Sequence, residues 1–360
     1  MALSFQKKLL FSAVAVAGLA LLVEYGSRAG YDLTRRRTKR LVQTFVRGDP
    51  YAQYQFRANV RNARIGDTVF STNAHGFRGP DLPWEAQPGA VRVIAAGDSV
   101  TFGWSASGDR TTYPAFLEET LRRRVPGRRV EVVNAGMPRY HAGDVLALTV
   151  SRLVFMLPRT VVVMVGANDV LYSIATPPST KTERLQQWVG RSRLLSLIKD
   201  GWREVMPASW RARAVEDLLA ARERAADNVS ISGPIQFELT LRALVHVLRR
   251  QNVRAALVTY PLFLKERMSR AEKERMLPYL AKYPNLSYAG WRRIYDSLRD
   301  RVERVAREEG ALGIAGHRLT DLRYFADMIH LTDAGNQALA GLVAEGLLRD
   351  GVLAQGPEAR

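Results

Sequence analysis

The stretch Val91 to Gly103, VRVIAAGDSVTFG, decides the fold of this chain. It opens with apolar and β-branched residues, which predict a strand buried in a sheet. The strand breaks at Gly97-Asp98-Ser99, where small residues allow a sharp turn and leave a hydroxyl at its tip. In open α/β sheets, reactive groups gather beyond the carboxyl ends of the strands, so Ser99 is a candidate nucleophile. Gly, Asp and Ser also favour simple turns, and the triplet alone is equally consistent with one.

Strands and helices alternate through the rest of the chain. Further apolar strands are expected over Arg129 to Asn134, Thr160 to Val165, Arg254 to Tyr260 and Ala311 to Ala315. Of these, Thr160 to Val165 is the most apolar and is expected at the centre of the sheet. Amphipathic helices are expected over Tyr113 to Arg124, Asp144 to Phe155, Phe237 to Arg250, Tyr288 to Glu309, and up to about Leu348. This rhythm predicts the α/β class, with a three-layer α/β/α sandwich around a central, mostly parallel five-stranded sheet.

The composition of the chain limits the classes of protein and of binding partner that need to be considered. A chain of 360 residues with 47% hydrophobic and 24% charged residues is typical of a folded protein, not of a disordered one. The formal net charge of +18 would suit nucleic acid, anionic lipid or an acidic polymer. The basic residues are mostly arginines interleaved with glutamates on helices, which is typical of solvated helix surface, and no nucleic-acid-binding module is evident. We therefore expect no nucleic-acid partner. The absence of cysteine excludes disulfides and thiolate metal sites.

Other strand ends and the last helix carry further polar groups. Asp327-Met328-Ile329-His330 places a carboxylate three residues before a histidine. The carboxylate can bond one imidazole nitrogen, which leaves the other free to take a proton from a hydroxyl. The expected strands ending near Asn134 and Val165 run into small or polar residues, Asn134-Ala135-Gly136 and Gly166-Ala167-Asn168-Asp169. A histidine that merely caps the last helix is the simpler alternative for His330. No metal site is expected, because no second histidine clusters with it.

In their order along the chain, these blocks resemble those of the SGNH, or GDSL-type, hydrolase superfamily. The lead-in around Asn73 to Gly79 resembles that of its bacterial members with an N-terminal membrane anchor. The resemblance spans roughly Asn73 to Leu348. It rests on Gly97-Asp98-Ser99 with Thr101-Phe102-Gly103, on Asn134-Ala135-Gly136, on Gly166-Ala167-Asn168-Asp169, and on Asp327 to His330 with Leu331 and Gly335. It implies a flavodoxin-like fold and a serine esterase that needs no cofactor.

Carried over position by position, the resemblance implies a role for each site residue. Ser99 would be the nucleophile, His330 the general base and then acid, and Asp327 the group that orients His330. The oxyanion hole would comprise the N–H groups of Ser99 and Gly136 and the side-chain amide of Asn168. Related proteins often continue after this glycine with a second glycine before an aromatic residue, whereas here the sequence reads Arg139-Tyr140. Both are candidates for substrate binding, and a salt-bridged surface arginine is the alternative for Arg139.

The regions outside the hydrolase domain are expected to be distinct. Leu9 to Val23 is an uncharged apolar run without a clean cleavage site, so residues 1–24 are expected to form a signal anchor or transmembrane helix. A basic juxtamembrane segment is expected at 25–60, the hydrolase domain at 61–350 and a tail at 351–360. Residues 170–231 break the strand and helix rhythm and are expected to form an inserted helical cap.

The orientation of the anchor is open. The resemblance implies attachment to the bacterial inner membrane with the catalytic domain in the periplasm or outside the cell. By the positive-inside rule, the basic cluster after the apolar run instead draws the C-terminal side towards the cytoplasm. That cluster consists of Arg35, Arg36, Arg37, Lys39 and Arg40.

Three functions remain to be weighed. The leading hypothesis is a membrane-anchored serine ester hydrolase that forms an acyl-Ser99 intermediate. The resemblance implies small acyl groups, such as O-acetyl on envelope or extracellular polysaccharide, so the expected partners are an ester substrate such as an acylated carbohydrate and the membrane. A polysaccharide O-acetyltransferase with the same residues is the first alternative, because it differs only in which nucleophile resolves the acyl-enzyme. The second alternative is a basic, non-catalytic polymer-binding protein, in which the four blocks would have no role.

Overall fold

A computed structural model describes residues 44–175, 230–231, 233–265, 267–274 and 287–353, with isolated residues at 14, 18, 19, 21–27, 216 and 220. Contacts divide the chain into two compact units, one of residues 1–44 and 176–218 and the other of residues 45–175 and 219–360. Within the described ranges, no helix has both the length and the apolar character needed to cross a bilayer. Most of the expected anchor, most of the expected cap at 170–231 and the tail from 354 lie outside the described residues.

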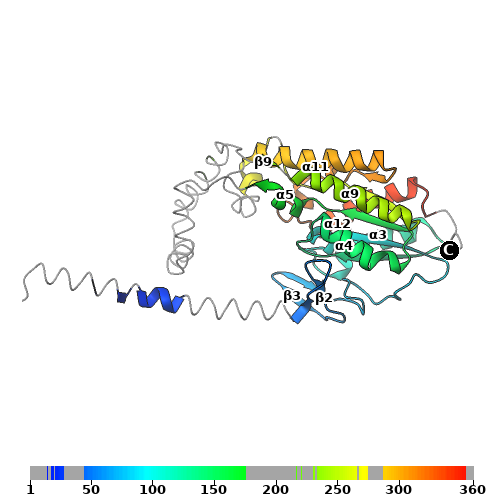
Figure 1. Ribbon diagram of the computed structural model, residues 1–360, viewed down its shortest axis with the longest axis horizontal. Helices are drawn as coiled ribbons and strands as arrows, with labels where there is room; N and C mark the ends of the chain where they lie inside the picture. The colour runs from blue at the N-terminus through cyan, green and yellow to red at the C-terminus, as the bar shows by residue number, and fades with distance from the viewer. Residues whose placement is uncertain are drawn as a thin grey trace, which may run out of the picture. The chain divides into compact units, whose positions relative to one another are not determined.

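A five-stranded sheet forms the centre of the second unit (Figure 1). Its order is β11-β10-β7-β5-β6, and every neighbouring pair is parallel. The strands are β5 (Ala90–Gly97), β6 (Arg129–Gly136), β7 (Thr160–Met164), β10 (Arg254–Val258) and β11 (Leu312–Ile314). The central strand, β7, is buried at every residue, as a strand covered on both faces must be. The predicted α/β class and five-stranded sheet are confirmed.

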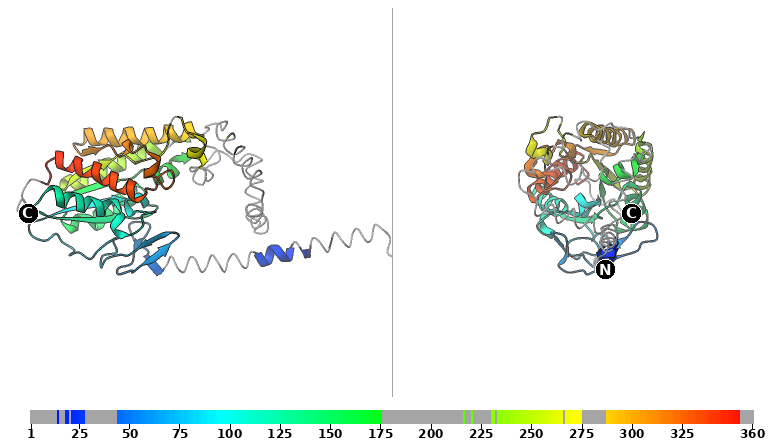
Figure 2. Two further views of the ribbon diagram at one scale, coloured as in Figure 1. Left: turned by 180° about the vertical axis from the view of Figure 1, so that it is seen from behind. Right: turned by 90° about the vertical axis from the view of Figure 1, so that its left-hand side faces the viewer.

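Helices cover both faces of this sheet. They are α3 (Tyr113–Arg124), α4 (Ala142–Ser151), α9 (Gly233–Arg250), α11 (Tyr288–Glu308) and α12 (Asp333–Arg349). Right-handed crossovers place α3 on one face and α4, α9 and α11 on the other. The contacts agree, because α12 packs on α3 while α9 packs on both α4 and α11. Figure 1 shows α9 beside α11, and the view from behind in Figure 2 shows α12 in red. The three-layer sandwich is therefore confirmed.

Side-chain caps fix where the helices begin. The hydroxyl oxygen of Thr112 accepts a hydrogen bond from an N–H in the first turn of α3, and Ser287 does the same for α11. At α12, Thr332 Oγ1 accepts from the Gly335 N–H at 3.2 Å. A cap of this kind typically contributes about 1 kcal/mol. The last cap matters most for the site, because His330 lies just before it.

The folded unit begins earlier than the sequence suggests. The hydrolase domain was expected from residue 61, but the second unit starts at Phe45. Strands β1 (Val46–Arg47) and β2 (Gln55–Phe56) pair antiparallel, and β3 (Ala63–Ile65) pairs with β4 (Thr68–Phe70). The Phe56 ring is buried and stacks on Phe102 with ring centroids 5.1 Å apart. Residues 45–60 therefore belong to the core that supports the site.

Arg78 joins this N-terminal part to the segment that carries Ser99. Its side chain is buried, and its guanidinium donates to Asp109 at 2.8 Å and to the carbonyls of Phe102 and Gly103 at 3.1 and 2.9 Å. All of these acceptors lie within the protein, so Arg78 serves packing and has no surface to offer a substrate.

A second buried arginine, Arg92, holds the amino-terminal half of the sheet. It lies opposite Glu131 in the β5–β6 register, and the two form an ion pair at 2.7 Å. The same guanidinium donates to the backbone carbonyls of Pro83, Trp84, Glu85 and Met156. Because the charge is paired and hydrogen-bonded on all sides, its burial is tolerated.

Candidate active site

Ser99 is the first residue of a short helix that directly follows β5. This helix, α2 (Ser99–Phe102), is preceded by Asp98, whose carboxylate accepts from the Val100 N–H at 3.0 Å. A Cβ at Gly97 would lie 2.3 Å from the Met164 carbonyl oxygen, so only glycine fits there. The Gly-Asp-Ser triplet thus fixes a tight strand-to-helix turn that presents the serine. A helix this short has no periodicity, and the sequence reading placed only a turn here.

The structure brings Ser99, His330 and Asp327 together. Ser99 Oγ lies 3.0 Å from His330 Nε2, although the two residues are 231 positions apart in the chain. His330 Nδ1 lies 2.6 Å from Asp327 Oδ2. The other oxygen of Asp327 accepts the N–H groups of Ile329 and His330, each at 2.8 Å. A hydroxyl, a base and an orienting carboxylate in series is the arrangement used for nucleophilic catalysis.

The charge of Asp327 sets the tautomer of His330. Burial raises the pKa of Asp327, but the hydrogen bonds from the His330 side chain and the two backbone N–H groups outweigh it, and the pKa lies below its ordinary value of 3.8. The carboxylate is therefore charged at neutral pH and accepts the proton on Nδ1. In the neutral imidazole this tautomer carries no proton on Nε2, so Nε2 can accept the proton of Ser99.

Asp98 is the most deeply buried acid of the site. Its Oδ1 also accepts from the Tyr260 hydroxyl at 3.1 Å, and among the described residues its Oδ2 has no hydrogen-bond partner. Burial raises the pKa of Asp98 from 3.8 to about 7, against the opposing effect of the bonds from Val100 and Tyr260. Asp98 therefore retains a proton well above the range of an ordinary carboxyl group, in a position that supports the turn before Ser99.

Gly136 differs from its expected role as an oxyanion donor. Its N–H already donates to Asn134 Oδ1 at 3.1 Å, and Asn134 Nδ2 in turn donates to the Phe102 carbonyl at 3.2 Å. A Cβ at Gly136 would lie 2.1 Å from the Phe102 nitrogen. This glycine therefore allows β6 to approach α2 closely, and its N–H is not available to a ligand in this arrangement.

The turn after β6 offers a different N–H group. The Tyr140 N–H donates to the Met137 carbonyl at 3.1 Å, and Arg139 has φ of 70°, which is the pattern of a type II turn. The Tyr54 hydroxyl donates to the Pro138 carbonyl at 2.7 Å and so fixes the peptide unit between Pro138 and Arg139. The C=O and N–H of a trans peptide point in opposite directions, so the Arg139 N–H points away from Tyr54. No hydrogen bond within the described ranges uses this N–H.

Asn168 lies at the same edge of the sheet. It belongs to α5 (Ala167–Ser173), which follows β7, and its Nδ2 donates to the Tyr140 carbonyl at 2.9 Å. One of its two amide hydrogens thus holds the 137–140 turn. The Asp169 carboxylate ties the same segments again by accepting the Ala142 N–H at 2.9 Å, and burial raises the pKa of Asp169 to about 6.

The two residues expected to bind substrate are placed differently from each other. Tyr140 is fully buried, and its hydroxyl donates to the Tyr54 carbonyl. Because Tyr140 lies in the core, it cannot contact a substrate, and its aromatic ring contributes to packing. Arg139 is exposed, and its guanidinium forms no ion pair with any described residue. The alternative of a salt-bridged surface arginine is therefore not seen in the described part of the chain.

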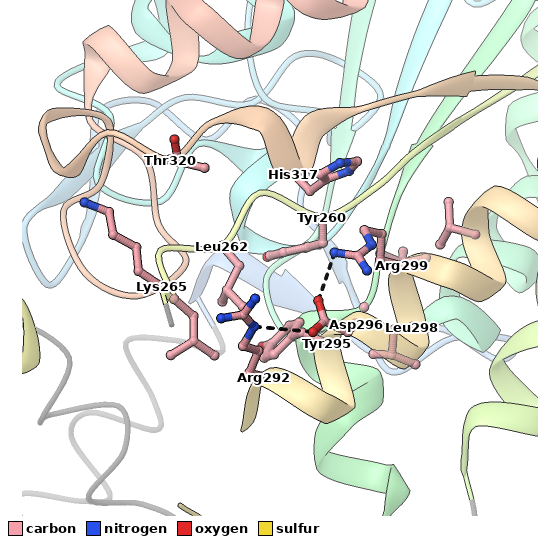
Figure 3. Close-up of a pocket in the computed structure, with 14 residues that line it drawn as sticks. Tyr260, Leu262, Lys265, Arg292, Tyr295, Asp296, Leu298, Arg299, His317 and Thr320 are labelled. Atoms are coloured by element: carbon pink, nitrogen blue, oxygen red, sulfur yellow. Dashed lines mark hydrogen bonds and ion pairs between the residues drawn. The ribbon is translucent and has the colours of Figure 1, made fainter. Parts of the chain in front are cut away.

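A cavity of about 270 Å³ borders the site beyond the ends of β7 and β10 (Figure 3). Tyr260, which bonds Asp98, lines it, together with Leu262 and Leu298. Figure 3 shows Asp296 between Arg292 and Arg299, and both arginines form ion pairs with it. None of the residues that line this cavity is Ser99, Asp327 or His330, so it is a neighbour of the site and not the crevice that contains the triad.

Sequence reasoning missed two features beside the triad. The Trp104 ring centroid lies 6.3 Å from that of His330. The Ser107 N–H donates to Asp333 Oδ1 at 3.0 Å, and its hydroxyl donates to the other carboxylate oxygen. This bridge joins the loop after α2 to the start of α12. The only signal in the sequence was that Trp104 and Ser107 follow Ser99 closely, because contacts across 226 positions leave no periodic pattern.

Comparison with known proteins gives a family and several related folds. A search of curated proteins found no match. The solved structures that resemble the chain include a lipase/acylhydrolase from Enterococcus faecalis, which is 15% identical with a TM-score of 0.44 and covers 75% of this chain and 99% of its own. An acetyl xylan esterase, AlAXEase, is 16% identical with a TM-score of 0.42 and covers 72% and 99%. A GDSL-like lipase from Bacteroides thetaiotaomicron is 13% identical with a TM-score of 0.42 and covers 72% and 88%.

The assignment rests on the family match. The model of the GDSL-like lipase/acylhydrolase family matches residues 95–338, from within β5 to within α12, which is more than half of the chain. The match includes the strand ends that carry Ser99 and Asn168 and the segment that carries Asp327 and His330. Since so much of its length is covered, the chain belongs to the GDSL-like lipase/acylhydrolase family and is an enzyme of the ester-hydrolase type.

Proposed function

We propose that the protein hydrolyses carboxylic esters through an acyl-enzyme on Ser99. The series from Ser99 through His330 to Asp327 carries this proposal. His330 Nε2 takes the hydroxyl proton while Ser99 Oγ attacks the carbonyl carbon. The carbon–oxygen bond to the alcohol then breaks, and His330 gives its proton to the departing alcohol oxygen. Water repeats the sequence: it loses a proton to His330, attacks the acyl carbon and releases Ser99, which recovers the proton.

The oxyanion hole of this proposal contains the Ser99 N–H, the Asn168 side-chain amide and the Arg139 N–H. The Arg139 N–H takes the place first expected for Gly136, whose N–H is bonded to Asn134. Its support is the fixed type II turn and the Asn168 bond to the Tyr140 carbonyl, which holds the two donors at one edge of the sheet. Removing one donor of this kind typically costs about 3 kcal/mol of transition-state stabilisation.

The substrate class of this proposal is a small O-acyl ester, such as O-acetyl on envelope or extracellular polysaccharide. Its support is the sequence resemblance, and the cavity of Figure 3 is not the proposed acyl pocket, because no residue of the triad lines it. Transfer of the acyl group to a sugar hydroxyl remains the alternative outcome of the same acyl-enzyme. Product analysis with a sugar acceptor separates the two, because hydrolysis yields the acyl group only as the free acid, whereas transfer yields an acylated acceptor.

Membrane attachment through residues 1–24 is part of the same proposal. Its support is the apolar run from Leu9 to Val23. The expected site of action is the periplasm or the cell exterior. A reporter enzyme that works only in the periplasm, fused to the C-terminus, tests this orientation, and an inactive reporter on a stable fusion overturns it.

The catalytic proposal is tested with a serine-directed fluorophosphonate and a short-chain nitrophenyl ester. The wild-type chain is expected to hydrolyse the ester and to carry the label on Ser99. Ser99→Ala is expected to do neither. Ser151→Ala, which changes a serine of α4 whose hydroxyl donates to the Ala147 carbonyl of the same helix, is the matched control and should behave as the wild type. Labelling of another serine, or full activity of Ser99→Ala, would refute the proposal.

A further inference from the structure

The loop after α2 holds Trp104 in a fixed position beside the triad. The Trp104 N–H donates to the Ser99 carbonyl at 2.8 Å, and the next N–H, that of Ser105, donates to Thr68 Oγ1 at 3.3 Å. Ser105 has φ of 73°, a left-handed conformation that is strained for a residue with a side chain. The Ser107–Asp333 bridge closes the loop on its far side. Strain of this kind persists only where surrounding contacts over-determine the backbone, and it gathers at functional sites.

The Trp104 ring lies next to the catalytic base. Its plane is inclined by 37° to the imidazole of His330, with ring centroids 6.3 Å apart. The side chain is only partly buried, and it packs against the edge of the core. Its backbone is bonded both to Ser99 and, through Ser107, to the helix that follows His330. The backbone that carries the ring is therefore held relative to both reacting groups.

The chemistry of the site determines which half of an ester meets this ring. His330 must deliver a proton to the alcohol oxygen, so the alcohol half lies within hydrogen-bond reach of Nε2 when the bond breaks. The carbonyl oxygen is turned towards the donors beyond β6 and β7, where Asn168 lies. The group that meets Trp104 is therefore the alcohol half, and not the acyl half.

We propose that Trp104 is a binding platform for the alcohol half of the substrate and takes a pyranose ring by its C–H face. This inference rests on the proposed esterase function and names its substrate class. An aromatic face pairs with the apolar C–H face of a sugar, while the hydroxyl groups at the sugar's edge need polar surroundings. The rim of the loop supplies them, because Ser105 and Ser107 are both exposed. A long aliphatic alcohol would need apolar walls instead.

The kinetic test compares two acetyl esters that differ only in the alcohol. These are an acetylated methyl pyranoside and ethyl acetate, assayed with the full chain. Trp104→Ala is expected to lower kcat/KM for the pyranoside by about tenfold more than for ethyl acetate, the effect of a single good aromatic contact. Trp104→Phe, which keeps an aromatic face, should recover most of the difference. Phe155→Ala, which removes a 57% exposed aromatic side chain in the 3-10 turn Leu153–Met156, is the control and should change neither value.

A binding measurement separates this inference from the esterase proposal. The binding measurement uses Ser99→Ala, in which no acyl-enzyme can form, and calorimetry with a methyl pyranoside or a short oligosaccharide of the same sugar. The double variant Ser99→Ala/Trp104→Ala should bind this sugar about tenfold more weakly than Ser99→Ala alone. Equal losses on both esters, or binding that does not depend on Trp104, overturn the platform. A wild-type chain that hydrolyses neither ester but binds the sugar through Trp104 would overturn the esterase proposal and leave the platform standing.

Discussion

The buried carboxyl of Asp98 makes the stability of the protein depend on pH in a defined direction. Its pKa is about 7 in the folded chain against an ordinary value of 3.8, mainly because of burial. Between these two values the folded state holds a proton that the unfolded chain has released. The contribution of Asp98 to stability is therefore present at low pH and is lost as the pH rises through the folded-state pKa. The loss is about 1.4 kcal/mol for each pH unit, or about 4 kcal/mol across the whole interval.

The substitution Asp98→Asn removes this dependence while preserving the turn. An amide oxygen can still accept the bonds from the Val100 N–H and the Tyr260 hydroxyl. Relative to the wild type, the variant is expected to gain about 2 kcal/mol in free energy of unfolding between pH 5 and pH 7. Asp169, whose pKa is also raised by burial, titrates in both proteins, and repulsion from its carboxylate is the smallest of the causes that shift the pKa of Asp98, so its own contribution largely cancels in the comparison.

The assay is urea unfolding of the full chain at several pH values between 5 and 8. Asp300→Asn changes an aspartate whose side chain is 58% exposed, and it should follow the wild type at every pH. The reasoning is refuted by a difference between Asp98→Asn and wild type that stays constant over this range. Such a result would mean that Asp98 is ionised in the folded protein well below neutral pH.

Three further predictions concern the triad, the sheet and the turn after β6. Asp327→Asn should lower kcat on a nitrophenyl ester by about 10⁴-fold, because an amide cannot hold the required tautomer, and an unchanged kcat would exclude the orienting role. Arg92→Ala should lower the free energy of unfolding in urea by about 3–5 kcal/mol, because it leaves Glu131 buried without its main partner; a loss below about 1 kcal/mol would contradict this. Arg139→Gly should raise stability by about 1 kcal/mol by relieving the left-handed conformation, and it should retain esterase activity because glycine keeps the backbone N–H. A large loss of activity in this variant would instead assign the chemistry to the guanidinium.

The repeating elements of the fold could be predicted from the sequence, because burial imposes a pattern on them. The helix expected over Tyr113 to Arg124 has the bounds of α3, and the strand expected at the centre of the sheet is β7. The start of the folded unit could not be predicted, because β1 and β2 have only two residues each and the contact of Phe56 in β2 with Phe102 links distant parts of the chain. The burial of Arg92 was not foreseen either, since charged residues are rarely fully buried unless they are paired.

The candidate site also has features that the sequence predicts and features that it does not. Residues at strand ends could be found because parallel strands bring their carboxyl ends to one edge. Whether a particular backbone N–H is free to bind a ligand could not be predicted, because it depends on side chains such as that of Asn134, whose oxygen accepts the N–H of Gly136 two positions later. The left-handed conformation of Arg139 could not be predicted either, because an arginine side chain does not favour it. It follows from the type II turn that Pro138 and its neighbours impose.

The separation of Ser99 and His330 by 231 positions has a practical consequence. A fragment that stops before Asp327 contains the hydroxyl without its base, and the complementary fragment contains the base without a hydroxyl. Neither piece can cleave an ester by this mechanism, and turnover returns only when both dock on the same sheet. Ester cleavage is thus a direct readout of correct reassembly, which suits the protein to complementation assays in which two separately expressed pieces report on the proximity of whatever they are fused to.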